Sequence, residues 1–110
     1  MATRITSAGQ LNQRVTLQQR VDGVDEFNHP SVDFADVCKV WAFREGLGGT
    51  ASAAAGVEVL ISRERFVIRN RADIAADWRV VWRGAAYRIE SLQPLGDRME
   101  WLEAICRSTT

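Results

Sequence analysis

Short runs in which polar and apolar residues alternate, separated by turn residues, constrain this chain more than any other feature of its sequence. In residues 14–21, Val15 and Leu17 fall on one face while Thr16 and Gln18 fall on the other, which is the period of a β-strand. Comparable runs occupy residues 37–43, 63–71, 79–83, 87–92 and 99–107. No amphipathic helix longer than three turns is apparent, so the sequence predicts an all-β or mainly β fold, a small antiparallel barrel or sandwich of five or six strands.

The apolar faces of these runs define the expected core. Its members are Val15, Leu17, Val37, Trp41, Phe66, Ile68, Val80, Trp82, Tyr87, Ile89, Leu102 and Cys106. A chain of 110 residues with 46% hydrophobic content is near the size that supports one core. We therefore assign residues 11–107 to a single domain and expect residues 1–10 and 108–110 to be flexible polar tails.

Two longer segments between the runs are predicted to be loops. Residues 22–36 contain turn residues and five acidic side chains with no basic one. These acids are Asp22, Asp25, Glu26, Asp33 and Asp36. Residues 45–56 contain four glycines and several small neighbours, so we expect a long mobile loop with room for one short helical turn capped at Thr50.

Basic residues are concentrated locally, although the whole chain has no net charge. Lys plus Arg and Asp plus Glu both total 14, so overall basicity does not favour a nucleic acid or a membrane surface as partner. Strand alternation places seven arginines on faces that point away from the core. They are Arg63, Arg65, Arg69, Arg71, Arg79, Arg83 and Arg88.

Three interpretations of this basic face remain open. It could be an ordinary outer face whose surface ion pairs contribute under about 1 kcal/mol each. It could meet the acidic segment of a neighbouring copy in head-to-tail contacts that close into a ring. It could also bind nucleic acid, as a small β-barrel module using the Arg-rich sheet face, with Trp101 as the side chain available to stack on bases.

Candidate catalytic, cofactor-binding and metal-binding residues are not indicated. His29 is the only histidine, which excludes a zinc site built from several histidines of one chain. The glycine run 46–49 lacks the Gly-Lys-Ser/Thr ending of a phosphate-binding loop, and Asp22 and Asp25 do not have the spacing of a calcium loop. Cys38 and Cys106 fit buried thiols better than a disulfide framework or a metal cluster. We expect no enzyme activity and no cofactor.

Several segments, taken in order, resemble the head-tail joining proteins of tailed phages. They are Leu-Asn-Gln-Arg-Val-Thr-Leu-Gln at 11–18, Val-Trp-Ala at 40–42, Phe-Val-Ile-Arg at 66–69, Arg-Val-Val-Trp-Arg-Gly at 79–84, Tyr-Arg-Ile at 87–89 and Trp-Leu-Glu-Ala-Ile-Cys at 101–106. The resemblance covers about residues 9–107. This family of head-completion, stopper or adaptor proteins occurs in phages, prophages and gene transfer agents.

The resemblance implies a small β-barrel with one long loop, acting as a structural protein of the virion neck. Family members form a ring below the portal and adaptor, close the DNA channel after packaging and provide a docking surface for the tail. The implied partners are further copies of the chain, the portal or adaptor protein on the head side and a tail-completion or tail-terminator protein on the tail side. The genome passes through the channel without sequence-specific binding, and no membrane is involved. The chain would be made in the host cytoplasm, where the isolated subunit is expected to be monomeric.

Combining the resemblance with the charge pattern gives a set of candidate site residues. The expected subunit or adaptor interface comprises Arg63, Arg65, Arg69, Arg79, Arg83, Arg88 and Trp101, together with Asp22, Asp25, Glu26, Asp33 and Asp36. The expected mobile loop facing the channel comprises Gly46, Leu47, Gly48, Gly49, Thr50, Ala51, Ser52 and Gly56.

Overall fold

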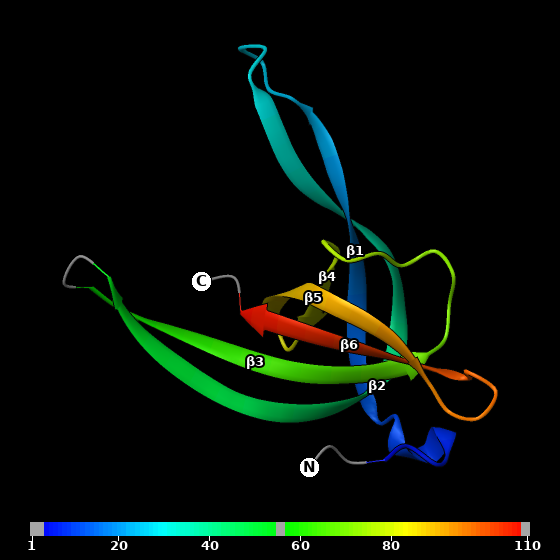
Figure 1. Cartoon of the computed structure of the whole chain (residues 1–110). Coiled ribbons are helices and arrows are strands. Elements are labelled where there is room, and N and C mark those ends of the chain that lie inside the picture. Colours follow the sequence, from blue (N-terminus) through cyan, green and yellow to red (C-terminus); the bar gives the residue numbers. More distant parts are fainter. Residues whose placement is uncertain (1–3, 55–56, 109–110) are drawn as a thin grey trace.

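Six antiparallel strands make up most of the described chain. The computed structural model describes residues 4–54 and 57–108, and the side chains of residues 50–60 lie outside that description. After a 3₁₀ helix, η1 (Ala8–Gln10), come β1 (Gln13–Val24), β2 (Pro30–Ala54), β3 (Val57–Arg69), β4 (Arg79–Trp82), β5 (Ala85–Leu95) and β6 (Trp101–Ser108). The strands close into a barrel in the order β1-β2-β3-β6-β5-β4 (Figure 1). The barrel alternative of the sequence prediction is therefore confirmed.

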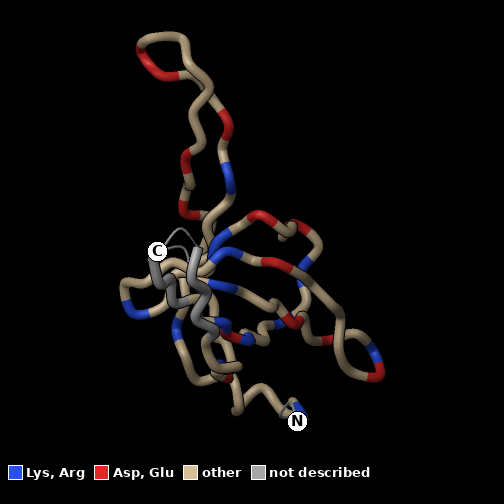
Figure 2. Tube along the Cα trace, turned by 60° about the vertical axis from the view of Figure 1, so that its left-hand side comes forward, with Lys and Arg blue, Asp and Glu red and all other residues tan. Residues whose placement is uncertain are grey.

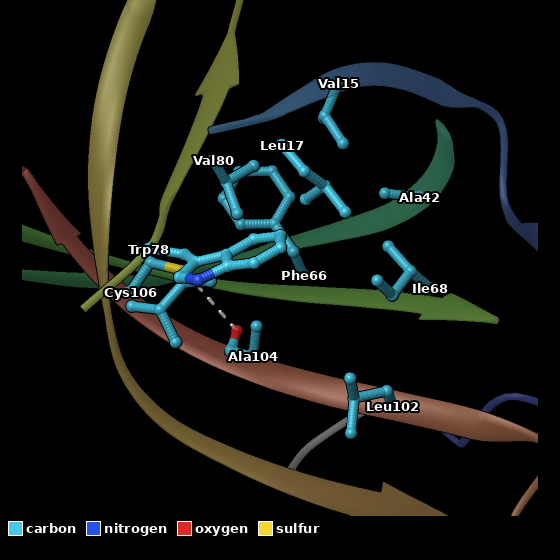
Figure 3. Packing of buried hydrophobic residues seen from close by; sticks show 11 residues of the cluster. Val15, Leu17, Ala42, Phe66, Ile68, Trp78, Val80, Leu102, Ala104 and Cys106 are labelled. Carbon is cyan, nitrogen blue, oxygen red and sulfur yellow. Dashed lines mark hydrogen bonds between the residues drawn. The ribbon is translucent and has the colours of Figure 1, made fainter. Parts of the chain in front are cut away.

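The barrel interior is filled by the side chains that alternate inward along the strands (Figure 3). Eight of the twelve predicted core residues are buried there, namely Val15, Leu17, Phe66, Ile68, Val80, Ile89, Leu102 and Cys106. Trp82 and Tyr87 are half-buried and pack against this cluster. Burial of a Val, Leu, Ile or Phe side chain contributes about 1.5–3 kcal/mol, so this cluster is the main source of stability.

The predicted core includes two exposed residues and omits three of the interior residues that the structure describes, Ala42, Ala104 and Trp78. Val37 and Trp41 are exposed at 39% and 54%, because they alternate with Cys38 and Val40, which are the residues of β2 that pack against the core. Trp78 directly precedes the predicted run at residues 79–83 and was not among the predicted core residues, yet it is 6% exposed and lies inside the barrel. Its carbonyl accepts a 2.9 Å hydrogen bond from the Ile89 amide, which ties this residue to β5.

A second apolar cluster lies on the outer face of the barrel and includes part of the chain N-terminus. Ile5 and Leu11 pack with Val67 of β3 and Trp101 of β6, and all four are at most 7% exposed. Ile5 is thus buried although it lies in the segment that we expected to be a flexible polar tail. The N-terminal segment instead covers one outer side of the barrel, so both faces of β3 are buried at Val67.

β1 and β2 continue beyond the barrel as a projecting hairpin (Figure 1). The pairing of β1 with β4 ends at Gln18, and the hairpin beyond it, residues 19–36, is called the acidic arm. At its turn, the Asp25 carboxylate accepts hydrogen bonds from the amides of Phe27 and His29, both at 2.9 Å, and Asn28 has a φ of 62°. The loop predicted for residues 22–36 is therefore wrong, since all but the turn residues are paired strand.

β2 and β3 form a second projecting hairpin on the other side of the barrel. β3 pairs with β6 only from Arg63 onward, so we call residues 46–62 the Gly/Ala arm. The register shifts between Gly46 and Gly49, where Gly48 has a φ of 84° that favours glycine. The loop with a helical turn predicted for residues 45–56 is wrong, because cross-strand pairing extends to Ala54 and Val57.

One strand, β2, therefore belongs to both arms and to the barrel wall. Its 25 residues pair with β1 from Pro30 to Ala42 and with β3 from Phe43 to Ala54. At about 3.3 Å per residue this strand has a contour length of roughly 80 Å, well above the 48 Å longest dimension of the molecule. β2 is accordingly strongly curved, as Figure 1 shows.

Candidate functional site: charged surfaces and arms

Four arginines lie side by side across neighbouring strands of the barrel wall. The pairing registers place Arg79 of β4 opposite Arg88 of β5, Arg88 opposite Arg107 of β6, and Arg107 opposite Arg63 of β3. Each follows or precedes a residue that points inward in the alternation, so the four side chains share the outer face. We call these four residues the arginine row.

The arginine row connects the bases of the two arms. Arg79 is the partner of Gln18, whose side-chain amide donates a 2.7 Å hydrogen bond to Asp36 at the base of the acidic arm. At the other end, Arg63 is the first residue of β3 beyond the Gly/Ala arm. Neighbouring strands lie about 4.8 Å apart, so the row spans roughly 15 Å along one line.

Such a row carries an electrostatic cost in the isolated chain. Like charges placed directly opposite each other on neighbouring strands are destabilising. The row is partly balanced by an ion pair of 3.5 Å between Arg63 and Glu90, and by the aromatic ring of Phe34, which lies 3.7 Å below the Arg79 guanidinium. Three of the four members remain exposed to solvent and Arg79 is half-exposed; the Arg63 side chain is 56% exposed.

Three of the arginines expected in the interface thus belong to the row, and three do not. Arg65 is only 3% exposed, because its guanidinium donates a 2.6 Å hydrogen bond to Glu103 and lies 3.5 Å from Glu45. Its predicted exposure on the basic face is wrong, since the outer side of the barrel is covered at this point. Arg69 and Arg83 are exposed but distant in register from the row, over the rings of Trp101 and Trp82 respectively.

The remaining expected basic and aromatic residues are also displaced from the predicted face. Trp101 is 6% exposed in the outer apolar cluster, so the stacking surface that a nucleic-acid platform would need is not available at this residue. Arg71 is half-buried and binds both carboxylate oxygens of Asp73, at 2.7 and 2.8 Å. The same guanidinium lies 2.8 Å from the Cys38 sulfur.

The five acids singled out in the sequence are gathered on the acidic arm (Figure 2). All five residues, Asp22, Asp25, Glu26, Asp33 and Asp36, are exposed. Asp25 holds the turn, Asp36 accepts from Gln18, and Asp22 pairs with Arg20 at 2.9 Å on the same strand. The arm also exposes Phe27 at 71%, Val24 at 65% and Val32 at 50%, so it presents apolar as well as acidic groups.

The residues expected to face the channel lie on the Gly/Ala arm. Gly46, Leu47, Gly48 and Gly49 are exposed near its base, and Thr50, Ala51 and Ser52 continue β2 opposite Ile61, Leu60 and Val59. Gly56 lies outside the described residues. The segment is thus a paired hairpin where a loop was predicted.

One groove with apolar and basic lining lies away from the arginine row. It has a volume of about 550 Å³ and is lined by apolar and basic groups, among them Leu11, Arg14, Trp41, Arg69 and Arg71. Arg14 lies over the exposed Trp41 ring at 5.0 Å. Aromatic and arginine side chains are enriched in protein–protein contacts, so the composition of this groove is typical of such a surface.

Metal-ligating side chains are not clustered in residues 4–54 and 57–108. No cluster of three or more His, Cys, Asp or Glu side chains suitable for a metal ion occurs there. No helix in that part of the chain is long and apolar enough to cross a membrane. Cys38 and Cys106 are both free thiols, and burial raises the pKa of Cys106 to about 12, with smaller contributions from Glu90 and Glu64.

Solved structures that share this fold include the following two. The first is a chain in the virion of a native gene transfer agent particle, with a TM-score of 0.74 and 19% sequence identity over 89% of this chain and 94% of that one. The second is the solution structure of protein SF1141 from Shigella flexneri 2a, with a TM-score of 0.67 and 24% identity over 96% and 98% of the two chains. No curated protein matches the sequence.

The sequence also matches a family model, and this match covers almost the whole chain. The model is that of the phage head completion protein, and it aligns with residues 6–109. The matched region contains all six strands, the arginine row and both arms. The chain therefore belongs to the phage head completion protein family and is a virion structural protein.

Proposed function

We propose that this protein assembles as a ring in the virion neck, below the portal or adaptor protein, where it closes the DNA channel after packaging and offers a docking surface to the tail. The family and the shared fold with a chain of a gene transfer agent virion support a place in the particle. The observation that carries the ring is the separation of an acidic arm from a basic row on one neutral chain. Complementary surfaces on different sides of a subunit favour head-to-tail contacts, which close into rings when the rotation permits.

In this ring the Gly/Ala arm is the element that points toward the channel. It projects from the barrel and carries no Lys or Arg between Gly46 and Ser62, so it offers no cation to DNA phosphates. Strong phosphate binding would slow a duplex that slides past during packaging, and an arm without basic groups avoids it.

Subunits of the ring contact one another, the head-side portal or adaptor protein and the tail-side completion or terminator protein through their charged surfaces. The neutral total charge fits a protein whose basic groups serve protein contacts, and DNA would pass without sequence-specific binding. Synthesis takes place in the host cytoplasm, and the finished protein resides in the neck.

Particles made without this protein, and particles complemented with variants, test the proposal. Complementation with the wild-type chain is expected to restore heads that keep their DNA and accept tails, with the protein seen as a ring in images of the neck. A chain whose residues 48–61 are replaced by a short turn keeps the barrel and is expected to enter the neck but to leak packaged DNA. The proposal fails if imaging finds the protein outside the neck, or if particles without it retain DNA and gain tails.

A further inference from the structure

We propose that the arginine row is the docking site for the acidic arm of the next copy of this chain. The inference rests on the proposed ring and identifies the two surfaces that would join its subunits. It departs from the set expected from the sequence, because Arg107 enters the site while Arg65, Arg69, Arg83 and Trp101 do not.

The first argument is the arrangement of like charge. Arg79, Arg88, Arg107 and Arg63 are consecutive cross-strand partners, so four guanidinium groups repel one another along a line of roughly 15 Å. Glu90 is the only acidic side chain that forms an ion pair with any of the four within the described residues. An anionic partner laid across the row would relieve this repulsion, and planar guanidinium groups bind carboxylates bidentately.

The second argument is that the acids at the apex of the arm lie away from the row of their own chain, although Phe34 near the base of the arm contacts Arg79. The acidic arm is a paired hairpin, and its turn is held by the Asp25 carboxylate through two 2.9 Å hydrogen bonds. Its apex, from Val24 to Pro30, points away from the barrel (Figure 1). A hairpin held by backbone pairing does not fold back, so its acids are available to another copy.

The third argument is the size and composition of the two surfaces. Residues 19–24 of β1 extend roughly 20 Å beyond the last pair with β4, which is enough to span the row. The arm also exposes Phe27, Val24 and Val32, which gives the contact apolar area beside its charges. Contacts between proteins combine such an apolar centre with a charged rim that fixes orientation and partner choice.

Charge reversal tests the contact with purified full-length chains. One variant reverses the row (Arg88→Glu with Arg107→Glu) and another reverses the arm (Glu26→Arg with Asp33→Arg), which leaves the turn residue Asp25 in place. A control variant, Arg4→Glu with Arg98→Glu, changes two exposed arginines outside the row. Backbone amide signals of ¹⁵N-labelled protein, followed as the chain is raised to about 1 mM at low salt, detect association that corresponds to only about −4 kcal/mol.

The wild-type and control chains are expected to show concentration-dependent shifts confined to the arm and the row. Either reversal variant alone is expected to associate at least tenfold more weakly, and an equal mixture of the two is expected to recover association, because each then meets an opposite charge. Absence of shifts at the arm and row in the wild type, or failure of the mixture to recover them, overturns the proposal.

Two further outcomes distinguish the arm–row contact from a nucleic-acid site and from the neck function itself. If a DNA duplex moves the row signals of the wild type while added protein does not, the row is a nucleic-acid site and the proposal is wrong. If the contact forms in solution but imaging finds the protein outside the neck, the contact stands and the proposed neck function fails. If imaging finds a ring in the neck with the arm on another surface, the neck function stands and the contact fails.

Discussion

Arg65 of β3 donates a 2.6 Å hydrogen bond from Nε to a carboxylate oxygen of Glu103 on β6, and both side chains are largely buried on the outer wall of the barrel. A second carboxylate, that of Glu45, lies 3.5 Å from the same guanidinium. Arg65 therefore serves as the shared counter-charge of two acids from the strands on either side of β3.

Replacement of Arg65 by methionine is expected to lower the free energy of unfolding by about 3–5 kcal/mol, because it leaves Glu103 and Glu45 partly buried without their common cation. Urea denaturation measures the loss. The matched control is Arg63→Met, two residues earlier on the same strand, whose side chain is 56% exposed. It should change stability by less than about 1 kcal/mol. Equal effects of the two changes would contradict this role of Arg65.

Trp78→Ala is expected to destabilise the fold by about 3–5 kcal/mol, because it removes a large side chain from the barrel interior and leaves a cavity. Trp41→Ala removes the same atoms from a site that is 54% exposed, and should cost less than about 1 kcal/mol. Thermal and urea unfolding of the two variants check the prediction. A larger loss for Trp41→Ala would mean that the core is assigned to the wrong tryptophan.

Alkaline pH is expected to destabilise the protein through Cys106. Burial raises the pKa of this thiol from 9.0 to about 12, so between these values the unfolded thiol releases its proton while the folded thiol keeps it. Unfolding is then favoured as pH rises, and this group contributes a loss of up to about 1.4 kcal/mol per pH unit over that interval. Its stabilising contribution is fully present below about pH 9.

Urea denaturation of the wild type and of Cys106→Val at a series of pH values measures this contribution as a difference of slopes. Other groups that titrate in the same range are common to both proteins and cancel. The valine variant should lose stability less steeply as pH rises. Parallel slopes would show that the Cys106 thiol does not differ in protonation between the folded and unfolded states.

Gly84→Ala is expected to cost about 1 kcal/mol or more. Arg83 and Gly84 form the two-residue connection between β4 and β5 and have φ values of 51° and 80°, the pattern of a type I′ turn. Gly23→Ala is the control, because Gly23 is not among the positive-φ glycines and a Cβ there would meet nothing closer than the Ser31 hydroxyl at 3.8 Å. It should be neutral or slightly stabilising. Thermal unfolding of the two variants measures both changes in stability.

The strands of the barrel wall could be predicted from the sequence because one face of each is buried. Val15 and Leu17, or Phe66 and Ile68, alternate with residues of the outer face, and this pattern marks a strand. The arms could not be predicted in the same way. The hairpin of residues 19–36 has no buried face, so its sequence lacks apolar alternation and has the composition of a loop.

Cross-strand register was the other quantity that the sequence could not supply. Arg107 lies opposite both Arg88 and Arg63, although it is 19 residues from the first and 44 from the second in the chain. Period-two alternation orients a side chain to one face but does not say which neighbours it meets. The exposure of Arg65 was mispredicted for a related reason, since the sequence does not show that β2 and β6 place Glu45 and Glu103 beside it.

Because β2 enters the barrel from the acidic arm and leaves it into the Gly/Ala arm, the two projections are joined by an unbroken run of covalent bonds. Tension on one projection therefore reaches the other without crossing a hinge loop. A neighbouring subunit that bound the acidic arm would therefore exert its force on the same strand that forms half of the Gly/Ala arm. In a ring of such subunits, mechanical stress at the outer contacts would be felt at the central opening.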